Sequence, residues 1–379
     1  MARTVSQTNG SPDKPAGARR LLPWWAAMRL VHATLRGVVP FGELDVDFRD
    51  PHGDPRSVTV VHGGAGVGKT MLLNALACTR PGNTTVATSL CAAEDGPPRL
   101  ACAWHLGEDE PTRPHPLVVC TPGTALDDDA LRRREQALFD RRAREQGGFV
   151  FLLLPANRWL SRQAVSLHAP ARSMLRYDVR STTAFDQGTS ADLTRETKQA
   201  LAYAAISSAL VPVGRLEVSE GHPRVDPRQL GSAMHEAVDT VVRLFGFVYE
   251  SLDPLSLEPR FSSPGGRRLP FDALPTRARH LVAIVAITIK TLWAAYPTVD
   301  PRTAEGVVAI DDADLHQDPT VQLELVRTLR TVLLGVQWIV TTSSAHLAAA
   351  AAPGEVIALR RMSEGDRVSL FVDHQARTH

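Results

Sequence analysis

The chain has 379 residues, 44% of them hydrophobic, and its 42 basic and 41 acidic side chains give a formal net charge of +1. This length and composition predict a globular protein with a sizeable core, in one large domain or two ordinary ones. The net charge excludes an overall attraction to nucleic acid or to membranes, although it leaves a local basic patch open.

The cysteines and the apolar runs bear on location. Cys78, Cys91, Cys102 and Cys120 lack the C-x₂₋₄-C spacing of a zinc site, and a chain this long does not need a disulfide framework. We therefore expect reduced thiols in a cytoplasmic protein. The longest uncharged apolar run, residues 281–289, is far shorter than the roughly 20 residues of a membrane helix, so we expect no bilayer-spanning segment.

The first elements in chain order lead from a tail to a glycine-rich loop. Residues 1–20 are polar and rich in Pro, Gly and Ser, which predicts a disordered tail. Residues 28–37 and 43–48 predict the two strands of a β-ribbon, because the second alternates apolar and acidic residues. The β-branched run at 57–61 predicts a short buried strand, and the leucine spacing from Thr70 onward predicts a helix.

The loop between this strand and this helix matches G-x-x-x-x-G-K-[ST], the pattern of a phosphate-binding loop. In such a loop backbone N–H groups surround the phosphates, the lysine reaches the β- and γ-phosphates, and the hydroxyl binds Mg²⁺. A glycine-rich turn with a lysine placed by chance is the alternative. It is weakened because Lys14, Lys69, Lys198 and Lys290 are the only lysines in the chain. The predicted phosphate-binding residues are Gly63, Gly64, Ala65, Gly66, Val67, Gly68, Lys69 and Thr70.

The middle of the chain carries weaker signals. We expect strands at 99–106, 116–120 and 149–155, a charged helix at 129–146, and further helices at 195–210 and 233–248. The arginines of the charged helix could contact nucleic acid, or they could lie on a solvated helix face that also carries acids. Residues from about 125 to 265 therefore predict an inserted, mainly helical lobe.

The C-terminal part alternates helices and strands. We expect a helix at 275–296, a strand at 305–312, a helix at 318–334 that Asp318 caps, a strand at 337–344, and a hairpin of 355–362 with 367–374. Buried strands alternating with helices predict an α/β fold with a mainly parallel sheet that helices cover.

Two acids, Asp311 and Asp312, end the apolar strand VVAIDD. Carboxylates at this position are costly to desolvate unless a cation or hydrogen bonds compensate. A phosphate-binding loop needs such an acid to hold Mg²⁺, so we expect Thr70 and Asp311 to be the metal ligands. The alternative is a loop start with exposed acids.

Five stretches together resemble one family: LRGVVPFGELDVDF, GGAGVGKT, LPFDALPTRARHLVAI, VVAIDDADLHQDP and WIVTTSS. They resemble the ABC-type ATPase heads of the RecF, SMC and OLD-like group, including compact bacterial AAA proteins. The resemblance covers residues 28–80 and 269–346 and implies one ATPase domain over 21–379, a two-lobed head that sandwiches ATP in a dimer. It implies that Lys69 and Asp312 act in catalysis, with Asp312 in place of the usual water-activating glutamate. His316 and Pro319 match the loop that faces the dimer partner.

The chain departs from that family at three places. Asp312 is one methylene shorter than glutamate, and Ser343 stands in place of the switch histidine, although Thr341 and Thr342 are present. The signature segment, usually Leu-Ser-x-Gly-Glu, reads Leu-Pro-Thr-Arg-Ala at residues 274–278. Arg277 and Arg279 either supply the positive charge that this segment loses or belong to a surface helix end.

The resemblance implies an ATPase with ATP and Mg²⁺ as cofactors and with slow hydrolysis. It would form a homodimer on ATP and act on an effector protein or DNA, in DNA maintenance or phage defence. A non-hydrolysing nucleotide-gated scaffold or sensor is the alternative. A transporter ATPase fits less well, because FGELDVDF resembles the SMC-like heads, and a nuclease is disfavoured because no Toprim-type domain follows the hairpin.

Overall fold

A computed structural model describes residues 28–79, 97–105, 117–121, 150–168, 191–211, 226–362 and 368–372, with a few residues between 123 and 137. The predicted tail, Cys91 and most of the predicted charged helix at 129–146 lie outside the described residues.

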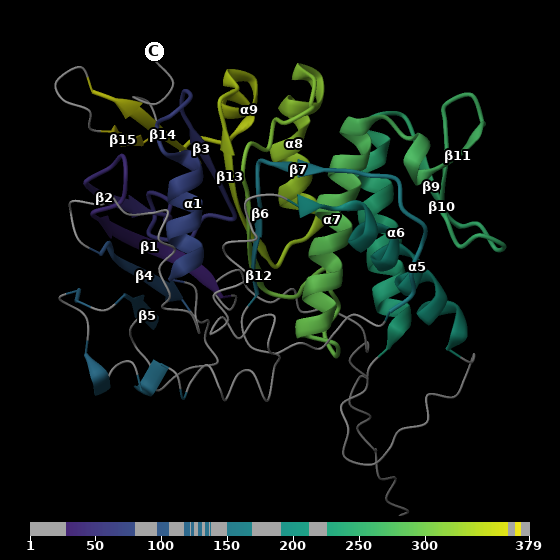
Figure 1. The fold of residues 1–379 in the computed structure, drawn as a ribbon, viewed down its shortest axis with the longest axis horizontal. Coiled ribbons are helices and arrows are strands. Elements are labelled where there is room, and N and C mark those ends of the chain that lie inside the picture. Colours follow the sequence, from purple (N-terminus) through teal and green to yellow (C-terminus); the bar gives the residue numbers. More distant parts are fainter. Residues whose placement is uncertain are drawn as a thin grey trace, which may run out of the picture.

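A six-stranded sheet forms the centre of the molecule (Figure 1). Its strands run in the order β15-β14-β3-β13-β12-β6, and all are parallel except β15, which pairs antiparallel with β14. They span β3 (Val58–His62), β6 (Phe151–Leu154), β12 (Gly306–Ile310), β13 (Val336–Thr342), β14 (Val356–Arg361) and β15 (Val368–Val372). The predicted parallel sheet and the C-terminal hairpin are therefore confirmed.

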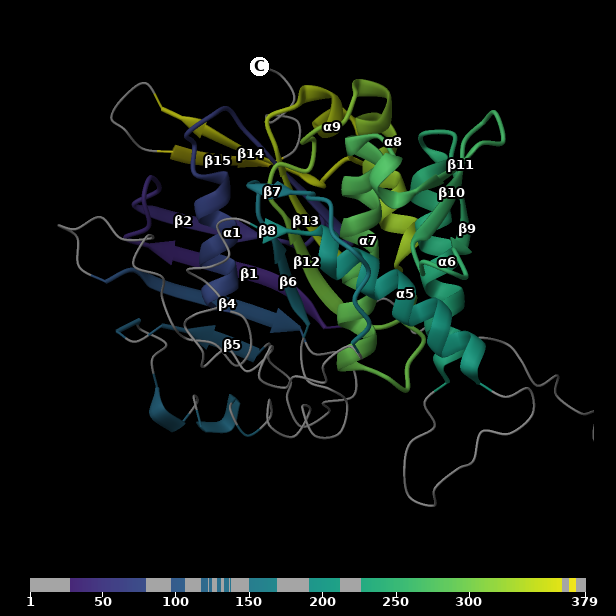
Figure 2. The same ribbon diagram turned by 45° about the vertical axis from the view of Figure 1, so that its right-hand side comes forward.

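One face of this sheet packs on helix α1 (Lys69–Cys78). Val61, Val307 and Ile339 point to this face and join a core cluster with Leu72 and Leu76 of the helix. The same cluster includes residues of a second, four-stranded antiparallel sheet, so α1 is sandwiched between two sheets (Figure 2). This sheet has the order β2-β1-β4-β5 and consists of β1 (Arg29–Arg36), β2 (Glu43–Asp47), β4 (Arg99–His105) and β5 (Leu117–Cys120). The predicted β-ribbon is half of it.

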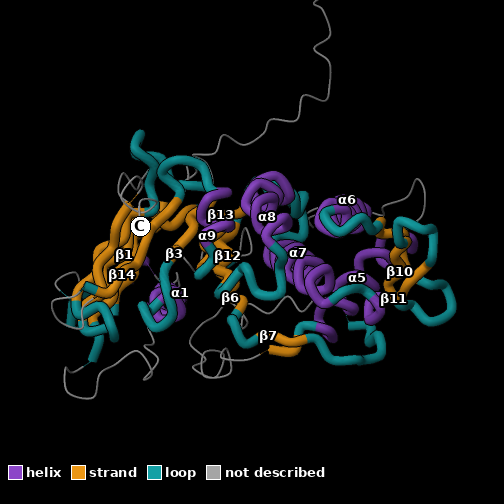
Figure 3. Tube along the Cα trace, turned by 90° about the horizontal axis from the view of Figure 1, so that it is seen from above, coloured by secondary structure: helices purple, strands orange, loops and turns teal. Residues whose placement is uncertain are grey.

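The opposite face of the parallel sheet is covered by helices, which Figure 3 shows on the side away from α1. They are α5 (Thr194–Leu210), α6 (Pro227–Arg243), α7 (Thr276–Ala295), α8 (Pro319–Val332) and α9 (Ala345–Ala350). Helix α7 is long and apolar enough to cross a membrane by length and composition, but 83% of its most apolar window is buried in the protein. It therefore serves here as the central helix of the core.

The lobe beyond these helices differs from the sequence prediction in two ways. Helix α6 begins at Pro227 rather than 233, because the Asp226 side chain accepts a hydrogen bond from Arg228 N and caps the helix. It ends at Arg243, and the chain then forms a three-stranded antiparallel sheet of β9 (Val248–Leu252), β10 (Pro259–Ser262) and β11 (Arg268–Pro270). A 3₁₀ turn, η3 (Phe271–Ala273), leads to α7, and β7 (Arg158–Trp159) pairs with β8 (Ala191–Asp192).

Candidate phosphate-binding site

The loop from β3 to α1 needs glycine for two physical reasons. Gly66 and Gly68 have φ values of 74° and 91°, in the left-handed region that favours glycine. A Cβ on Gly68 would lie 2.5 Å from the Pro40 side chain, and a Cβ on Gly63 would lie 2.7 Å from the carbonyl oxygen of Leu359. The β1–β2 turn and strand β14 thus press on this loop from two sides and fix its path.

The loop borders a cavity of about 710 Å³ at the start of α1. Gly68 is the N-cap of α1, and no side chain caps the first N–H groups of the helix. Free N–H groups and the positive end of the helix dipole favour an anion at such a place. The cavity is lined by Val39, Pro40, Ala65, Gly66, Gly68, Lys69, Thr70, Met71, Asp312, Ser343 and Arg361.

Two cationic side chains lie across the loop. The Lys69 ammonium donates to the carbonyl oxygens of Gly63, at 2.8 Å, and of Gly64, at 2.9 Å. The Arg361 guanidinium, from the end of β14, donates to the carbonyl oxygen of Gly66 at 3.2 Å. Positive charge therefore adds to the N–H groups of the loop, and the combined field suits a polyphosphate.

The two predicted metal ligands are in contact. Asp311 is buried at the carboxyl end of β12, and one of its carboxylate oxygens accepts a hydrogen bond of 2.7 Å from the Thr70 hydroxyl. The other oxygen accepts from the Thr341 hydroxyl at 2.6 Å, and that hydroxyl accepts from the Asp312 N–H at 2.8 Å. Thr341 thus sets the positions of both acids from the neighbouring strand β13.

These residues fit Mg²⁺. The Thr70 hydroxyl and the Asp311 carboxylate are hard oxygen ligands that already lie side by side next to the cavity. Within the described ranges, no three or more His, Cys, Asp or Glu side chains group as a separate metal site. Mg²⁺ commonly binds through one or two protein oxygens together with substrate phosphates, so the small ligand set is sufficient.

Asp312 lines the cavity in an unusual backbone conformation. Its φ is 45°, a left-handed value that Asp and Asn adopt more readily than most other residues. This backbone gives a physical reason for an aspartate where the related heads have a glutamate. Burial and the neighbouring Asp311 carboxylate raise the pKa of Asp312, and the Lys69 charge opposes that rise.

Arg158 is a site residue that no motif in the sequence identifies. Its guanidinium is 4% exposed and donates to the carbonyl oxygens of Asp311, at 2.5 Å, and Asp312, at 2.8 Å. Burial lowers the pKa of Arg158, while the nearby carboxylates act in the other direction. A usable signal exists, because Arg158 follows the end of strand β6, and ligand sites of open α/β sheets lie beyond the carboxyl ends of the strands.

The two positions that match the family's partner-facing elements pack on each other. The Arg277 guanidinium, in the first turn of α7, pairs with Asp318 at 2.5 Å and lies 5.8 Å from the centre of the Phe245 ring. Arg279 donates to the Thr276 hydroxyl at 3.2 Å. Pro319 is the first residue of α8, and His316, with a φ of 64°, stacks its ring 4.6 Å from that of His280 on α7.

Comparison with known proteins yields no matching family model and no matching curated protein. Solved structures do match. An SMC head bound to the C-winged helix domain of ScpA is 12% identical, covers 92% of this chain and 99% of its own, and gives a TM-score of 0.52. A Pyrococcus furiosus SMC head with an extended coiled coil, bound to the C-terminal domain of ScpA, is 14% identical over 91% and 96%, with a TM-score of 0.50. An SMC head domain from Thermotoga maritima is 14% identical over 91% and 98%, with a TM-score of 0.43.

The chain has the fold of an SMC head. The predicted fold class, a P-loop NTPase fold of the ABC/SMC type with a mainly parallel sheet, is confirmed by these matches and by the strand order. In this SMC-like head the residues from the two ends of the sequence, near position 65 and near position 311, meet at one cavity. The identities are too low to carry function from the solved heads to this chain.

Proposed function

We propose that the protein is an ATPase of the ABC/SMC-like class that binds ATP and Mg²⁺ at the loop of residues 63–70. The observation that carries this proposal is the contact between Thr70 and Asp311, 241 positions apart in the chain, beside a cavity that Lys69 also lines. A loop, a lysine and an acid at one cavity are the parts that nucleotide hydrolysis needs.

Each residue has a separate task in this proposal. The N–H groups of the loop and the Lys69 ammonium hold the phosphates, and Arg361 adds charge from the other side. Thr70 and Asp311 hold Mg²⁺, which neutralises charge on the phosphates. Asp312 orients the attacking water and accepts its proton, within a hydrogen-bond reach of about 2.6–3.2 Å. The short side chain of Asp312 leads us to expect slow hydrolysis.

We further propose that ATP joins two copies of the chain. Each nucleotide would lie between the loop of one copy and the start of α7 of the other, as the RecF, SMC and OLD-like resemblance implies. The degenerate signature segment at 274–278 gives no serine hydroxyl for a phosphate, so the contact would depend on backbone groups of the first turn of α7. The nucleotide-gated scaffold without hydrolysis is the second candidate, favoured by this segment and by Asp312.

The partner that receives the change is, in our proposal, a protein. Two of the solved heads are bound to domains of ScpA, which makes a protein partner a reasonable expectation for an SMC-like head. The outer face of the antiparallel sheet offers little to DNA, since Arg36 pairs with Glu43 at 2.8 Å and Asp45 accepts from Thr34. We place the protein in the cytoplasm, because Cys78, Cys102 and Cys120 form no disulfide.

Phosphate release and ATP-dependent mass, measured together, test the proposal. We expect slow release and a transient dimer for the wild type. Asp312→Asn suits the left-handed backbone equally well, so it should stay folded, stop hydrolysis and hold ATP in a stable dimer. Lys69→Ala should give neither dimer nor phosphate.

The outcomes separate the alternatives. Equal turnover in the wild type, Asp312→Asn and Asp312→Glu would remove Asp312 from the mechanism. A monomer at saturating ATP in every variant would reject the dimer. A wild-type dimer that forms on ATP but releases no radiolabelled phosphate would establish the scaffold in place of the ATPase.

A further inference from the structure

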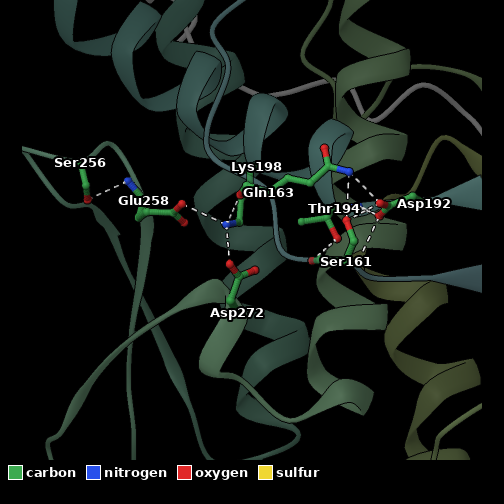
Figure 4. A network of polar contacts seen from close by, with 8 residues as sticks. All are labelled: Ser161, Gln163, Asp192, Thr194, Lys198, Ser256, Glu258 and Asp272. Atoms are coloured by element: carbon green, nitrogen blue, oxygen red, sulfur yellow. Dashed lines mark hydrogen bonds and ion pairs between the residues drawn. The ribbon is translucent and has the colours of Figure 1, made fainter.

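Lys198 is a fully buried lysine on helix α5, far in sequence from the phosphate-binding loop. Its ammonium donates to the Gln163 carbonyl oxygen at 2.6 Å, to Asp272 at 2.8 Å and to Glu258 at 3.0 Å (Figure 4). These three acceptors use all three donors of the ammonium group. The charge is therefore fully satisfied, although its burial is costly.

The three acceptors come from three separate segments. Gln163 lies in the strand that continues from Arg158, the residue whose guanidinium holds the carbonyl oxygens of Asp311 and Asp312. Glu258 begins strand β10 from the turn before it, and Asp272 lies in η3, immediately before α7. Lys198 thus joins the segment that holds the acids to the segment that sets the start of α7.

A second set of contacts fixes the Gln163 segment to α5 (Figure 4). Asp192 accepts hydrogen bonds from the Ser161 hydroxyl, from the Gln163 side chain at 2.8 Å and from the Thr194 N–H at 3.0 Å. The Thr194 hydroxyl donates to the Ser161 carbonyl oxygen at 2.9 Å. Residues 161–163 and the first turns of α5 therefore form one unit, and Lys198 extends that unit to Asp272.

The interface between the start of α7 and the acids contains buried polar atoms that lack partners. Among the described residues these include Arg158 Nε, Arg279 Nε, His280 Nδ1 and Gln317 Oε1. Buried polar groups of native proteins are nearly always hydrogen-bonded, so an interface with several orphans has an incomplete set of bonds. This is the place where a second arrangement of α7 could recover bonds, while Lys198 stays satisfied.

Lys290 provides the contrast. It is the other buried lysine on these helices, and it joins α7 to α5 through Glu196 at 3.1 Å. Its ion pair does not include the Gln163 segment or η3. Both lysines bury a charge between the same helices, but only Lys198 connects the acids to the start of α7.

We propose that Lys198 is a positioning residue that transmits a nucleotide-dependent change at Asp311 and Asp312 to the start of α7. The route runs from the acids to Arg158, along residues 158–163 to Lys198, and from Lys198 to Asp272. This inference rests on the proposed function, in that ATP must bind at the loop of residues 63–70. Lys198 itself touches no nucleotide.

Hydrogen–deuterium exchange of the full chain, with and without ATP and Mg²⁺, tests this role. In the wild type we expect ATP to change the exchange of amides at 271–281. Lys198→Met should bind a fluorescent ATP analogue with unchanged affinity and lose the ATP-induced change at 271–281. Lys290→Met, the matched control, should keep that change, although it also removes a buried lysine.

A second variant covers the case in which Lys198→Met fails to fold. The triple variant Lys198→Met, Glu258→Gln, Asp272→Asn leaves no unpaired charge, so it should fold and should also lose the ATP-induced change. An ATP-induced change at 271–281 that survives in both variants overturns the role of Lys198. A wild type that binds no ATP analogue rejects the proposed function and the inference with it. A wild type that binds and dimerises without any change at 271–281 rejects the inference alone.

Discussion

The carboxyl edge of the parallel sheet and the start of α7 are the two regions on which the proposed function depends, and they are built differently. At the sheet edge Lys69, Thr70 and Asp311 have close hydrogen-bond partners. At the start of α7 the Arg277 side chain is occupied by Asp318, and buried atoms of Arg279 and His280 lack partners. The first region is pre-organised within one chain, whereas the second gains bonds only from a rearrangement or another molecule.

The largest effect should come from breaking the pre-organised region. Lys69→Ala removes charge-assisted hydrogen bonds to the phosphates, so we expect ATP affinity to fall by at least about 100-fold, or about 2.8 kcal/mol. Titration with a fluorescent ATP analogue measures this loss. Arg36→Ala, which removes an exposed arginine paired with Glu43, is the control and should bind normally. Normal binding by folded Lys69→Ala would reject the phosphate site.

Gly68→Ala should produce the next largest effect. The substitution places a Cβ at φ 91° and within 2.6 Å of Phe41, so it meets both backbone strain and a collision. Gly53→Ala has nearly the same φ, 93°, with no atom within 4 Å, and it isolates the backbone contribution. We expect Gly68→Ala to be less stable than Gly53→Ala by about 2 kcal/mol in denaturant unfolding. Equal stabilities would mean that the β1–β2 turn does not press on the loop.

These two glycines also indicate what the sequence can and cannot predict. The loop, helix α1 and the acids at 311 and 312 are predictable, because local patterns of glycines, β-branched residues and acids specify them. The contact of Pro40 with Gly68 is not, since it depends on how two sheets enclose α1. Arg158 and Lys198 escape prediction for the same reason: their partners lie 153 and 74 positions away in the chain.

The His280 pair sharpens the comparison through pH. Burial lowers the pKa of His280 to about 3, and the charges of Arg158, His316 and Arg279 add to that effect. The folded protein therefore holds neutral His280, and the unfolded chain binds a proton near the ordinary pKa of about 6.5. Full stability is present above that value, and it is lost as the pH falls from about 6.5 toward 3.

The measurement compares unfolding free energies at pH 7.5 and pH 5.5. His280→Leu should lose about 1.4 kcal/mol less than the wild type on this change of pH. The exposed His346, replaced by Gln, is the control and should behave as the wild type does. An equal pH dependence in His280→Leu would show that the start of α7 does not exclude a charged imidazole.

Arg277→Ala should have the smallest effect and decides between the two interpretations of this residue. Its ion pair with Asp318 is largely exposed, so we expect a loss of about 0.5 kcal/mol in stability and little change in ATP turnover. If Arg277 instead acted on the nucleotide of the partner copy, turnover of Arg277→Ala would collapse. Mixing it with inactive Lys69→Ala would then restore activity, because a mixed dimer pairs an intact loop with an intact Arg277. We expect the mixture to lie at the average of its two components, as it must when Arg277 only joins α7 to α8.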